Sequence, residues 1–215
     1  PMTIRYYTPV DALLIGLDQA VRTLFGRPAT TGRPNPAADA PPADLPPEEQ
    51  RLAARLMRVN HSGEVCAQAL YQGQALTARL TAVRDRMERA TVEENDHLAW
   101  CEARLRELDS HPSALNPLFY AGAFAIGALA GAAGDRWSLG FVAETERQVV
   151  EHLNDHLERL PASDQPSRAI LEQMKQDEAR HAANAMAAGA ARLPFPIRAL
   201  MKGVSKVMTG TTYWV

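Results

Sequence analysis

Two Glu-x-x-His motifs could bind metal in this 215-residue sequence: Glu94 precedes His97 by three residues, and Glu178 precedes His181 in the same way. On a helix, side chains three residues apart are neighbours, with about 5–6 Å between their Cβ atoms. A carboxylate and an imidazole at this spacing can therefore reach one metal ion. A single motif of this kind is weak evidence, because polar helix faces often produce it by coincidence.

An internal repeat makes the two motifs part of one ligand set. Glu64 precedes the first motif by 30 residues, and Glu146 precedes the second by 32. Each half of the chain thus supplies one glutamate from an earlier helix and a Glu-x-x-His pair from a later one, which is how ferritin-like four-helix bundles hold two metal ions. The repeat predicts six metal ligands: Glu64, Glu94, His97, Glu146, Glu178 and His181.

The ligand types indicate which metal this site would hold. Four carboxylates and two imidazoles suit iron or manganese, and the set lacks the thiolates that a structural zinc or iron–sulfur centre would use. Four negative charges against two divalent ions make a nearly neutral site, so it can be buried. Six protein ligands for two ions also leave coordination positions free for dioxygen.

The repeat excludes two neighbouring residues from the ligand set. His61 lies three residues before Glu64, but its counterpart in the second half is Ala143. Glu144 lies two residues before Glu146, about 200° around the helix, so it should face elsewhere.

Four further polar residues are open to a functional interpretation, and for each of them we favour a solvated one. Glu93 and Asp177 directly precede the motif glutamates and could orient the ligands, but they point about 100° away from them. His152 and His156 are spaced like a zinc pair on a helix. They lack the adjoining glutamate of the metalloprotease motif, and plain polar surface is the favoured interpretation.

The surrounding sequence predicts the helices that must carry these ligands. Apolar residues recur at helical spacing from Glu48 onward, and no alternating strand pattern or Asn-Gly hairpin signal appears. The fold class is all-α: a ferritin-like antiparallel four-helix bundle, with an extra apolar crossover helix and a C-terminal amphipathic helix. The predicted bundle helices span Glu48–Arg79, Thr81–Asp109, Ser138–Leu160 and Pro166–Arg192, and the crossover spans Pro117–Gly134.

The chain before the bundle divides into two parts. An amphipathic helix is predicted from Thr8 to Gly26, within residues 1–26. Residues 27–47 carry seven prolines, which indicate an exposed linker or a strap over the surface, and we assign this segment no function. Residues 48–215 form the bundle with its C-terminal segment.

Composition limits the classes of protein. Hydrophobic residues make up 46% of the chain, which is typical of a packed globular protein, and a net charge of -2 argues against a nucleic-acid binder. Cys66 and Cys101 lack CxxC spacing and suggest a reducing compartment. No secretory signal is evident. The longest charge-free apolar stretch, Leu118–Ala133, is shorter than the ~20 residues of a membrane span.

The sequence resembles the demethoxyubiquinone hydroxylase family from about Leu56 to Tyr213. Four motifs carry the resemblance: Arg-Val-Asn-His-Ser-Gly-Glu at Arg58–Glu64, Glu-Asn-Asp-His-Leu at Glu94–Leu98, Glu-Thr-Glu-Arg-Gln-Val at Glu144–Val149, and Asp-Glu-Ala-Arg-His at Asp177–His181. The resemblance implies two iron ions per subunit, dioxygen as co-substrate and hydroxylation of 2-polyprenyl-3-methyl-6-methoxy-1,4-benzoquinol in ubiquinone biosynthesis. The ligands of that family fall on the same six residues that the repeat selects.

Several properties stay open beside this resemblance. Electrons could come from NADH, from the quinol itself or through another protein. Other ubiquinone-biosynthesis proteins and a second copy of the chain are possible partners. The same bundle also suits a ferritin-like iron-oxidising protein or a manganese peroxide-disproportionating protein. A metal-free scaffold would leave six buried polar ligands uncompensated, so it is the least favoured alternative.

The C-terminal segment predicts contact with a membrane surface. Leu193–Val215 combines regularly spaced apolar residues with three basic ones and contains no acidic residue. A basic amphipathic helix that ends in Tyr213 and Trp214 suits the headgroup interface. With a lipid substrate, this favours a peripheral membrane protein, at the cytoplasmic face of the cell membrane if it is bacterial. The alternatives are packing on the bundle and a dimer contact.

Overall fold

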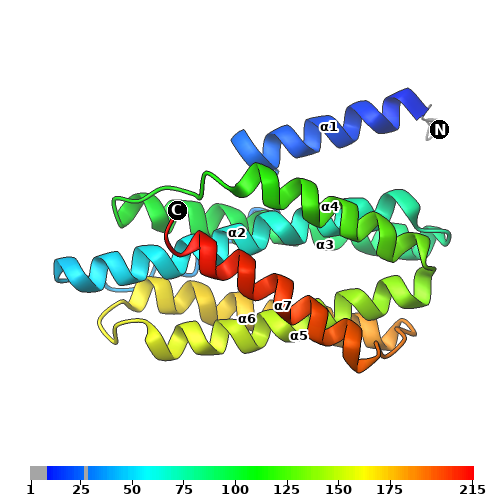
Figure 1. The fold of residues 1–215 in the computed structure, drawn as a ribbon. Coiled ribbons are helices and arrows are strands. Elements are labelled where there is room, and N and C mark those ends of the chain that lie inside the picture. Colours follow the sequence, from blue (N-terminus) through cyan, green and yellow to red (C-terminus); the bar gives the residue numbers. More distant parts are fainter. Residues whose placement is uncertain (1–8, 27–28) are drawn as a thin grey trace.

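The computed structural model describes residues 9–26 and 29–215, and within these ranges it contains helices and no strand (Figure 1). The predicted start of the first helix, Thr8, lies outside the described residues. The helices are α1 Pro9–Phe25, α2 Pro47–Thr77, α3 Thr81–Glu107, α4 Asn116–Ala132, α5 Asp135–Arg159, α6 Gln165–Ala187 and α7 Phe195–Thr212.

The bundle consists of two helix pairs. Helix α2 packs against α3, α5 packs against α6, and α3 meets α6 across the interior. Helix α4 lies along the outside of α2 and carries the chain to the second pair (Figure 1). The predicted all-α, ferritin-like bundle with an apolar crossover helix is confirmed.

The predicted boundaries of the bundle and crossover helices lie within three residues of the observed ones, except at the end of α6; the largest of the smaller differences is at α5, which begins at Asp135 and not at Ser138. Helix α6 ends at Ala187, five residues before the predicted end at Arg192. Gly189 adopts a φ of 91°, a left-handed conformation that glycine accepts at low cost and that ends helices. The amide of Ala190 then donates to the carbonyl of Ala185, which closes the last turn.

Two apolar clusters divide the bundle along its length. One is formed by the start of α2, the end of α3, the end of α5 and the start of α6, and includes Leu56, Leu105 and Leu171. The other lies around Tyr71 and Met87, at the opposite ends of the same helices. All six predicted ligands lie in the sequence between these clusters on their helices. The packing therefore places the ligands in one band at the middle of the bundle.

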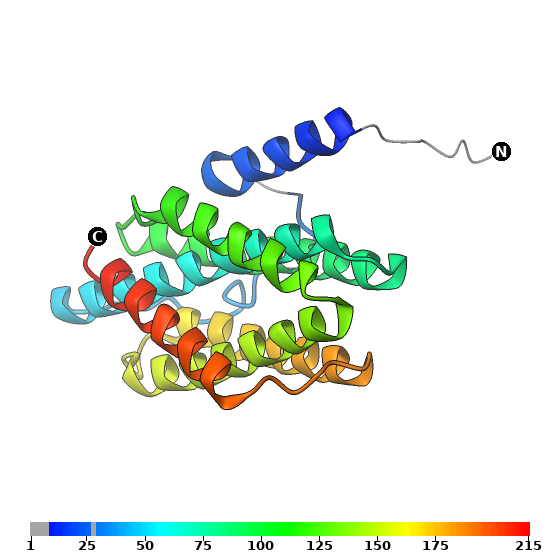
Figure 2. The ribbon, with the colours of Figure 1, turned by 45° about the vertical axis from the view of Figure 1, so that its right-hand side comes forward.

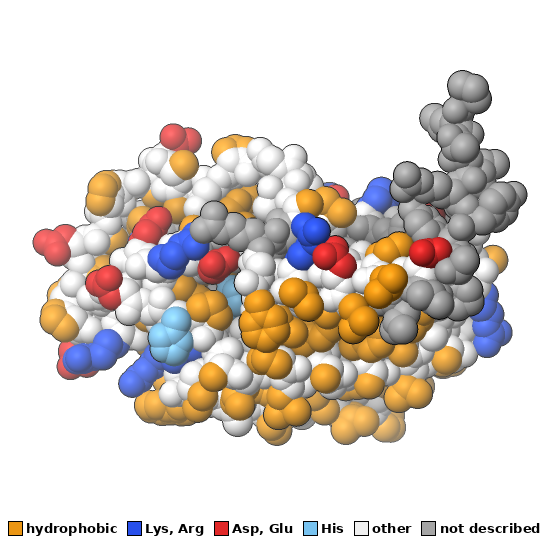
Figure 3. All heavy atoms as spheres, turned by 90° about the horizontal axis from the view of Figure 1, so that it is seen from above, with side chains coloured by type: hydrophobic (Ala, Val, Ile, Leu, Met, Phe, Trp, Pro, Cys, Tyr) orange, Lys and Arg blue, Asp and Glu red, His pale blue; other side chains and the backbone are white. Residues whose placement is uncertain are grey.

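Three helices lie outside the four-helix core. Helix α7 crosses α2 and α5 diagonally, and α1 covers part of α2 and α4, where Ala20 and Leu24 pack against a third apolar cluster. Figure 2 shows α1 standing on the outer side of the bundle. Figure 3 looks onto α1 and α4 and shows hydrophobic side chains gathered over much of this face. Among the described residues, no helix is both long and apolar enough to span a membrane.

Candidate metal centre

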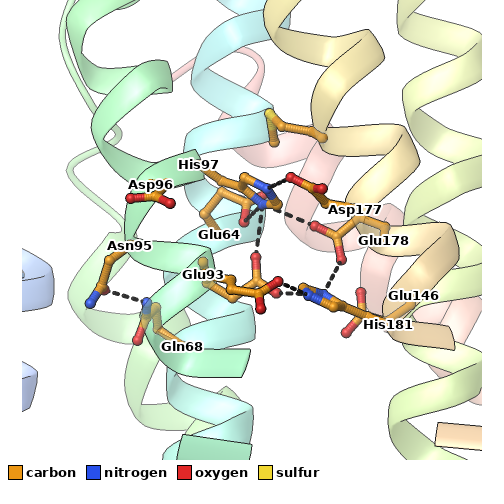
Figure 4. Close-up of polar contacts among 12 residues, drawn as sticks. Glu64, Gln68, Glu93, Asn95, Asp96, His97, Glu146, Asp177, Glu178 and His181 are labelled. Carbon is orange, nitrogen blue, oxygen red and sulfur yellow. Dashed lines mark hydrogen bonds and ion pairs between the residues drawn. The ribbon is translucent and has the colours of Figure 1, made fainter. Parts of the chain in front are cut away.

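The structure brings the six predicted ligands together from the four bundle helices, and Figure 4 labels all of them except Glu94. Each is buried, with at most 8% of its surface exposed. Glu64, Glu94, His97 and Glu178 each offer one ligand atom, and these four atoms all lie within 4.8 Å of one another.

Two of the glutamates are shared between the histidines. Glu94 Oε2 lies 2.9 Å from His97 Nδ1, while its Oε1 lies 3.2 Å from His181 Nδ1. Glu178 repeats the pattern, with Oε1 at 3.1 Å from His97 Nδ1 and Oε2 at 3.2 Å from His181 Nδ1. Each of these carboxylates thus spans the gap between the two imidazoles, which is the position of a bridging ligand.

The other two glutamates belong to opposite sides of the centre. Glu64 Oε2 lies 3.5 Å from His97 Nδ1. Glu146 lies close enough to Glu178 and His181 for both to influence the pKa of its carboxyl group. The six residues therefore form two half-sites, one with Glu64 and His97 and the other with Glu146 and His181, joined by the two shared carboxylates.

The electrostatics of the cluster call for positive charge. Burial raises the pKa of Glu64 and of Glu146 well above the ordinary value, and neighbouring carboxylates add to the shift. Burial would lower the pKa of His181, but the neighbouring carboxylates of Glu178 and Glu94 outweigh it and raise that pKa to about 12. Glu64 Oε2 and Glu94 Oε1 are buried without a hydrogen bond. Carboxylate oxygens left without donors among like charges fit a bound metal ion.

Each histidine is also held from behind by an acidic residue of the opposite motif. His97 Nε2 lies 3.0 Å from Asp177 Oδ2, and His181 Nε2 lies 2.8 Å from Glu93 Oε2. A proton on Nε2 that is donated to the carboxylate leaves Nδ1 free to face the centre.

The solvated interpretation of these two acids is therefore wrong for Asp177, which is fully buried, and incomplete for Glu93, whose side chain is 38% exposed. The angle of about 100° between each acid and the motif glutamate that follows it describes a single helix. The histidine that each acid contacts lies on the neighbouring helix, where α3 meets α6, and a single-helix angle does not predict that contact.

The two excluded residues do lie outside the ligand cluster. His61 is buried beside Asn116, with 3.4 Å between its Nδ1 and Asn116 Nδ2, and burial lowers the pKa of its imidazole to about 4. Glu144 accepts hydrogen bonds from Arg147 and Gln148 on its own helix.

His152 and His156 are not plain polar surface, so that interpretation is wrong. Their ring centroids lie 3.8 Å apart, and only 2% of His156 is exposed. The two histidines line a 270 Å³ pocket together with the end of α7 and with Tyr213 and Trp214, which follow that helix. Helix α7 lies some 50 residues further along the chain, so the local pattern contains no sign of this pocket.

One functional side chain was missed from the sequence. The hydroxyl of Tyr71 donates a hydrogen bond to Glu146 Oε1. Burial and the charge of Glu146 raise the pKa of the Tyr71 hydroxyl well above its usual value, so it stays a donor. Tyr71 follows Glu64 by seven residues, which is two helical turns, and this spacing places both on one face of α2.

Fold and centre together define a class: ferritin-like helical bundles whose interior holds a buried carboxylate–histidine metal site. The family model for the ubiquinone biosynthesis protein COQ7 matches residues 51–212, and the chain belongs to this family.

The curated relatives agree with this assignment along almost the whole chain. A protein of Nitrosococcus oceani is 59% identical over 98% of this chain and 99% of its own length. A protein of Ectopseudomonas mendocina is 59% identical over 97% of each chain. One of Pseudomonas paraeruginosa is 55% identical, also over 97% of each. All three are named 3-demethoxyubiquinol 3-hydroxylase.

Proposed function

We propose that this protein is an O2-dependent di-iron monooxygenase that hydroxylates the ring of 2-polyprenyl-3-methyl-6-methoxy-1,4-benzoquinol in ubiquinone biosynthesis. The observation that carries the proposal is the pair of shared carboxylates, Glu94 and Glu178, each with one oxygen toward either imidazole. The hydroxylase name of the close relatives supports the reaction and favours it over iron oxidation and peroxide disproportionation.

The protein side chains have defined tasks in this proposal. Glu64 and His97 would hold one iron ion, Glu146 and His181 the other, and the shared glutamates both. Two iron ions, when bound, would lend the two electrons that activate dioxygen. One oxygen atom would enter the ring, the other would leave as water with two protons, and the external donor would give the two electrons back to the irons.

The surroundings of the centre prepare it for this chemistry. Asp177 and Glu93 fix the ring orientation of the two histidines, and Tyr71 fixes Glu146. The apolar clusters on either side of the centre keep water away from it, and this strengthens the electrostatic interactions among its charged side chains.

A turnover assay tests the proposed reaction. Purified iron-loaded protein with a short-tailed demethoxybenzoquinol and oxygen should yield a product that is heavier by one oxygen atom, measured by mass spectrometry. Parallel reactions with NADH and with excess quinol alone identify the electron donor. Rapid oxidation of ferrous iron without a hydroxylated product would favour the iron-oxidising alternative. Oxygen release from peroxide by the manganese form would favour the peroxide-disproportionating alternative.

We further propose that the protein docks on a membrane surface through α7, α4 and α1, at the cytoplasmic face if it is bacterial. Apolar side chains more than half exposed lie on all three helices and, for Trp214, just after α7: Leu14, Leu17, Val21, Phe25, Leu118, Leu129, Phe195, Leu200, Val207 and Trp214. Helix α7 adds the exposed bases Arg198, Lys202 and Lys206. It also touches α2 and α5, so packing on the bundle and docking on lipid are compatible.

Vesicle flotation measures this docking. The full chain should float with vesicles that contain anionic lipid, and a chain that ends before Leu193 should float much less. Because that truncation also removes one wall of the pocket that His152 and His156 line, we expect the sharper result from Leu200→Ser with Val207→Ser. Two apolar side chains withdrawn from lipid weaken binding by at least about 10-fold, at ~1.5–3 kcal/mol for each fully buried side chain.

The matched control is Val92→Ser, which changes an exposed apolar residue of α3, away from the three docking helices. Its flotation should equal that of the unchanged protein. Equal flotation of the α7 variant and the control would rule α7 out as the docking element.

A further inference from the structure

The segment between α1 and α2 lies against the metal centre. Residues 29–38, here called the strap, have no helix and run along the bundle before the chain enters α2 at Pro47. Figure 2 shows the blue trace of this segment between the helices of the two halves. Ala37 and, further on, Leu45 pack against the apolar cluster at this end of the bundle.

The strap is bound to α3 beside the ligand His97. The amide of Thr31 donates to Asp96 Oδ1 at 2.8 Å, and its hydroxyl donates to Asp96 Oδ2 at 2.5 Å. Asn95 Nδ2 donates to the carbonyl of Ala29 at 2.7 Å. Only 1% of Asp96 is exposed, so these bonds close over a buried carboxylate.

Arg33 extends this contact across the bundle to α6. Its Nε donates to Asp96 Oδ2 and its Nη1 donates to Asp177 Oδ2, both at 2.8 Å. The guanidinium lies 5.0 Å from the centroid of the Trp100 ring, a stacked position that arginine favours. One planar cation therefore joins two buried carboxylates from different helices.

The local backbone explains why the side chains of Thr31 and Arg33 both face Asp96. Gly32 has a φ of 83°, a left-handed conformation that reverses the chain between Thr31 and Arg33. Pro34 and Pro36 follow, and their fixed φ angles reduce the number of conformations that the segment loses on folding.

The oxygen that Arg33 contacts is the one that orients His97. Asp177 Oδ2 lies 3.0 Å from His97 Nε2, while Asp177 Oδ1 receives Arg180 at 2.8 Å and Gln173 at 3.1 Å. Both oxygens are thus held by two donors each, and the carboxylate cannot turn without breaking several hydrogen bonds.

The two half-sites differ in how firmly the acid that orients each histidine is held. Glu93, which orients His181, is 38% exposed and is held by Arg180 alone among the arginines of the described residues. Asp177 is fully buried and has Arg180 on one side and Arg33 on the other. We propose that Arg33 is a positioning residue, which locks Asp177 and through it the imidazole of His97, so that the strap stabilises metal binding at the Glu64–His97 half-site in particular.

This inference rests on the proposed metal centre, and cobalt binding tests the two separately. Metal-free full-length protein is titrated with Co2+ and followed by calorimetry and by the visible absorption of the bound ion. We expect the unchanged protein to bind two ions. In Arg33→Ala, one ion should bind as before and the other about 10-fold more weakly, the lower end of the effect of residues that orient a ligand.

Rescue and control variants separate positioning from general stability. Arg33→Lys keeps the charge but carries all its N–H donors on one nitrogen, so it should recover part of the lost affinity. Thr31→Ala loosens the strap without touching Asp177 and should weaken the same ion by a smaller factor. Asp39→Ala, an exposed change just beyond the strap, should bind both ions normally. In the iron-loaded enzyme, Arg33→Ala should lower kcat and leave the KM for quinol unchanged.

Each contrary result has its own meaning. Two normal affinities in Arg33→Ala would overturn the role of Arg33 while leaving the metal centre intact. Equal weakening of both ions without rescue by Arg33→Lys would overturn it too, because it indicates a general loss of stability. If Arg33→Ala fails to fold by circular dichroism, the comparison of Thr31→Ala with Asp39→Ala decides in its place. No cobalt bound by the unchanged protein would overturn both the centre and this inference.

Discussion

Glu178→Ala is expected to abolish quinol hydroxylation and to reduce the bound iron. Glu178 has an oxygen within 3.2 Å of each histidine, so its removal takes a ligand from both half-sites at once. Changes to residues that only orient a ligand already cost 10–100-fold in metal affinity or activity, and we expect the loss here to exceed about 100-fold. Iron per chain and turnover should be measured on the same preparation. His181→Ala should behave similarly, with the larger loss in its own half-site.

The matched control for this experiment is Glu172→Ala. Glu172 lies on the same helix, away from the metal centre, and forms an ion pair with Lys175 at the surface. This variant should retain both iron and turnover. A Glu178→Ala protein that kept full turnover and a full complement of iron would remove the proposed di-iron mechanism.

The ligand set could be predicted from sequence because its pattern occurs twice. A single Glu-x-x-His often arises by coincidence on a polar helix face. A second copy, at nearly the same distance from its own preceding glutamate, rarely does. Helical periodicity alone then places Glu64 and Glu94 on faces that meet inside the bundle. No long-range contact needed to be known.

The residues that support the ligands could not be found in this way. Arg33 contacts Asp96 over a separation of 63 residues and Asp177 over 144. No helical repeat connects a Pro-rich segment to these carboxylates, so the linker carried no predicted role. The acids themselves were visible as polar neighbours of the motifs, yet whether such a residue meets water or a histidine depends on the facing helix.

The close approach of α4 to α2 was likewise hidden, although the apolar crossover itself was predicted. Gly127 lies on α4 where a Cβ atom would meet the backbone of Leu70 on α2, and Gly73 on α2 faces the backbone of Phe124 and Ala128 in the same way. Thr77 Oγ1 also donates to the Ala128 carbonyl at 3.0 Å. Composition shows that α4 is rich in small residues, but it does not show which of them touch another backbone.

Gly127→Ala should therefore destabilise the protein, although alanine is the better helix former by ~1 kcal/mol. The added methyl group meets backbone atoms, which cannot move aside as a flexible side chain can, and overpacking of this kind typically costs 1–3 kcal/mol. Because the nearest backbone atom is the Leu70 carbonyl oxygen, only 2.2 Å from the added Cβ, we take the upper end of this cost and expect a net loss of about 2 kcal/mol, or a fall of about 4–8 °C in Tm for a chain of this size. Thermal unfolding of the metal-free protein measures it.

The same substitution five residues earlier gives the opposite expectation. Gly122 is exposed on α4 with no atom within 4 Å of the position that a Cβ would take. Gly122→Ala should therefore gain only the helix preference and raise Tm by about 2–4 °C. Because both changes add one methyl group to one helix, the difference between them isolates the contact of α4 with α2. If the two variants unfold at the same temperature, α4 does not lie against Leu70, and the helix that carries Glu64 must be packed in some other way.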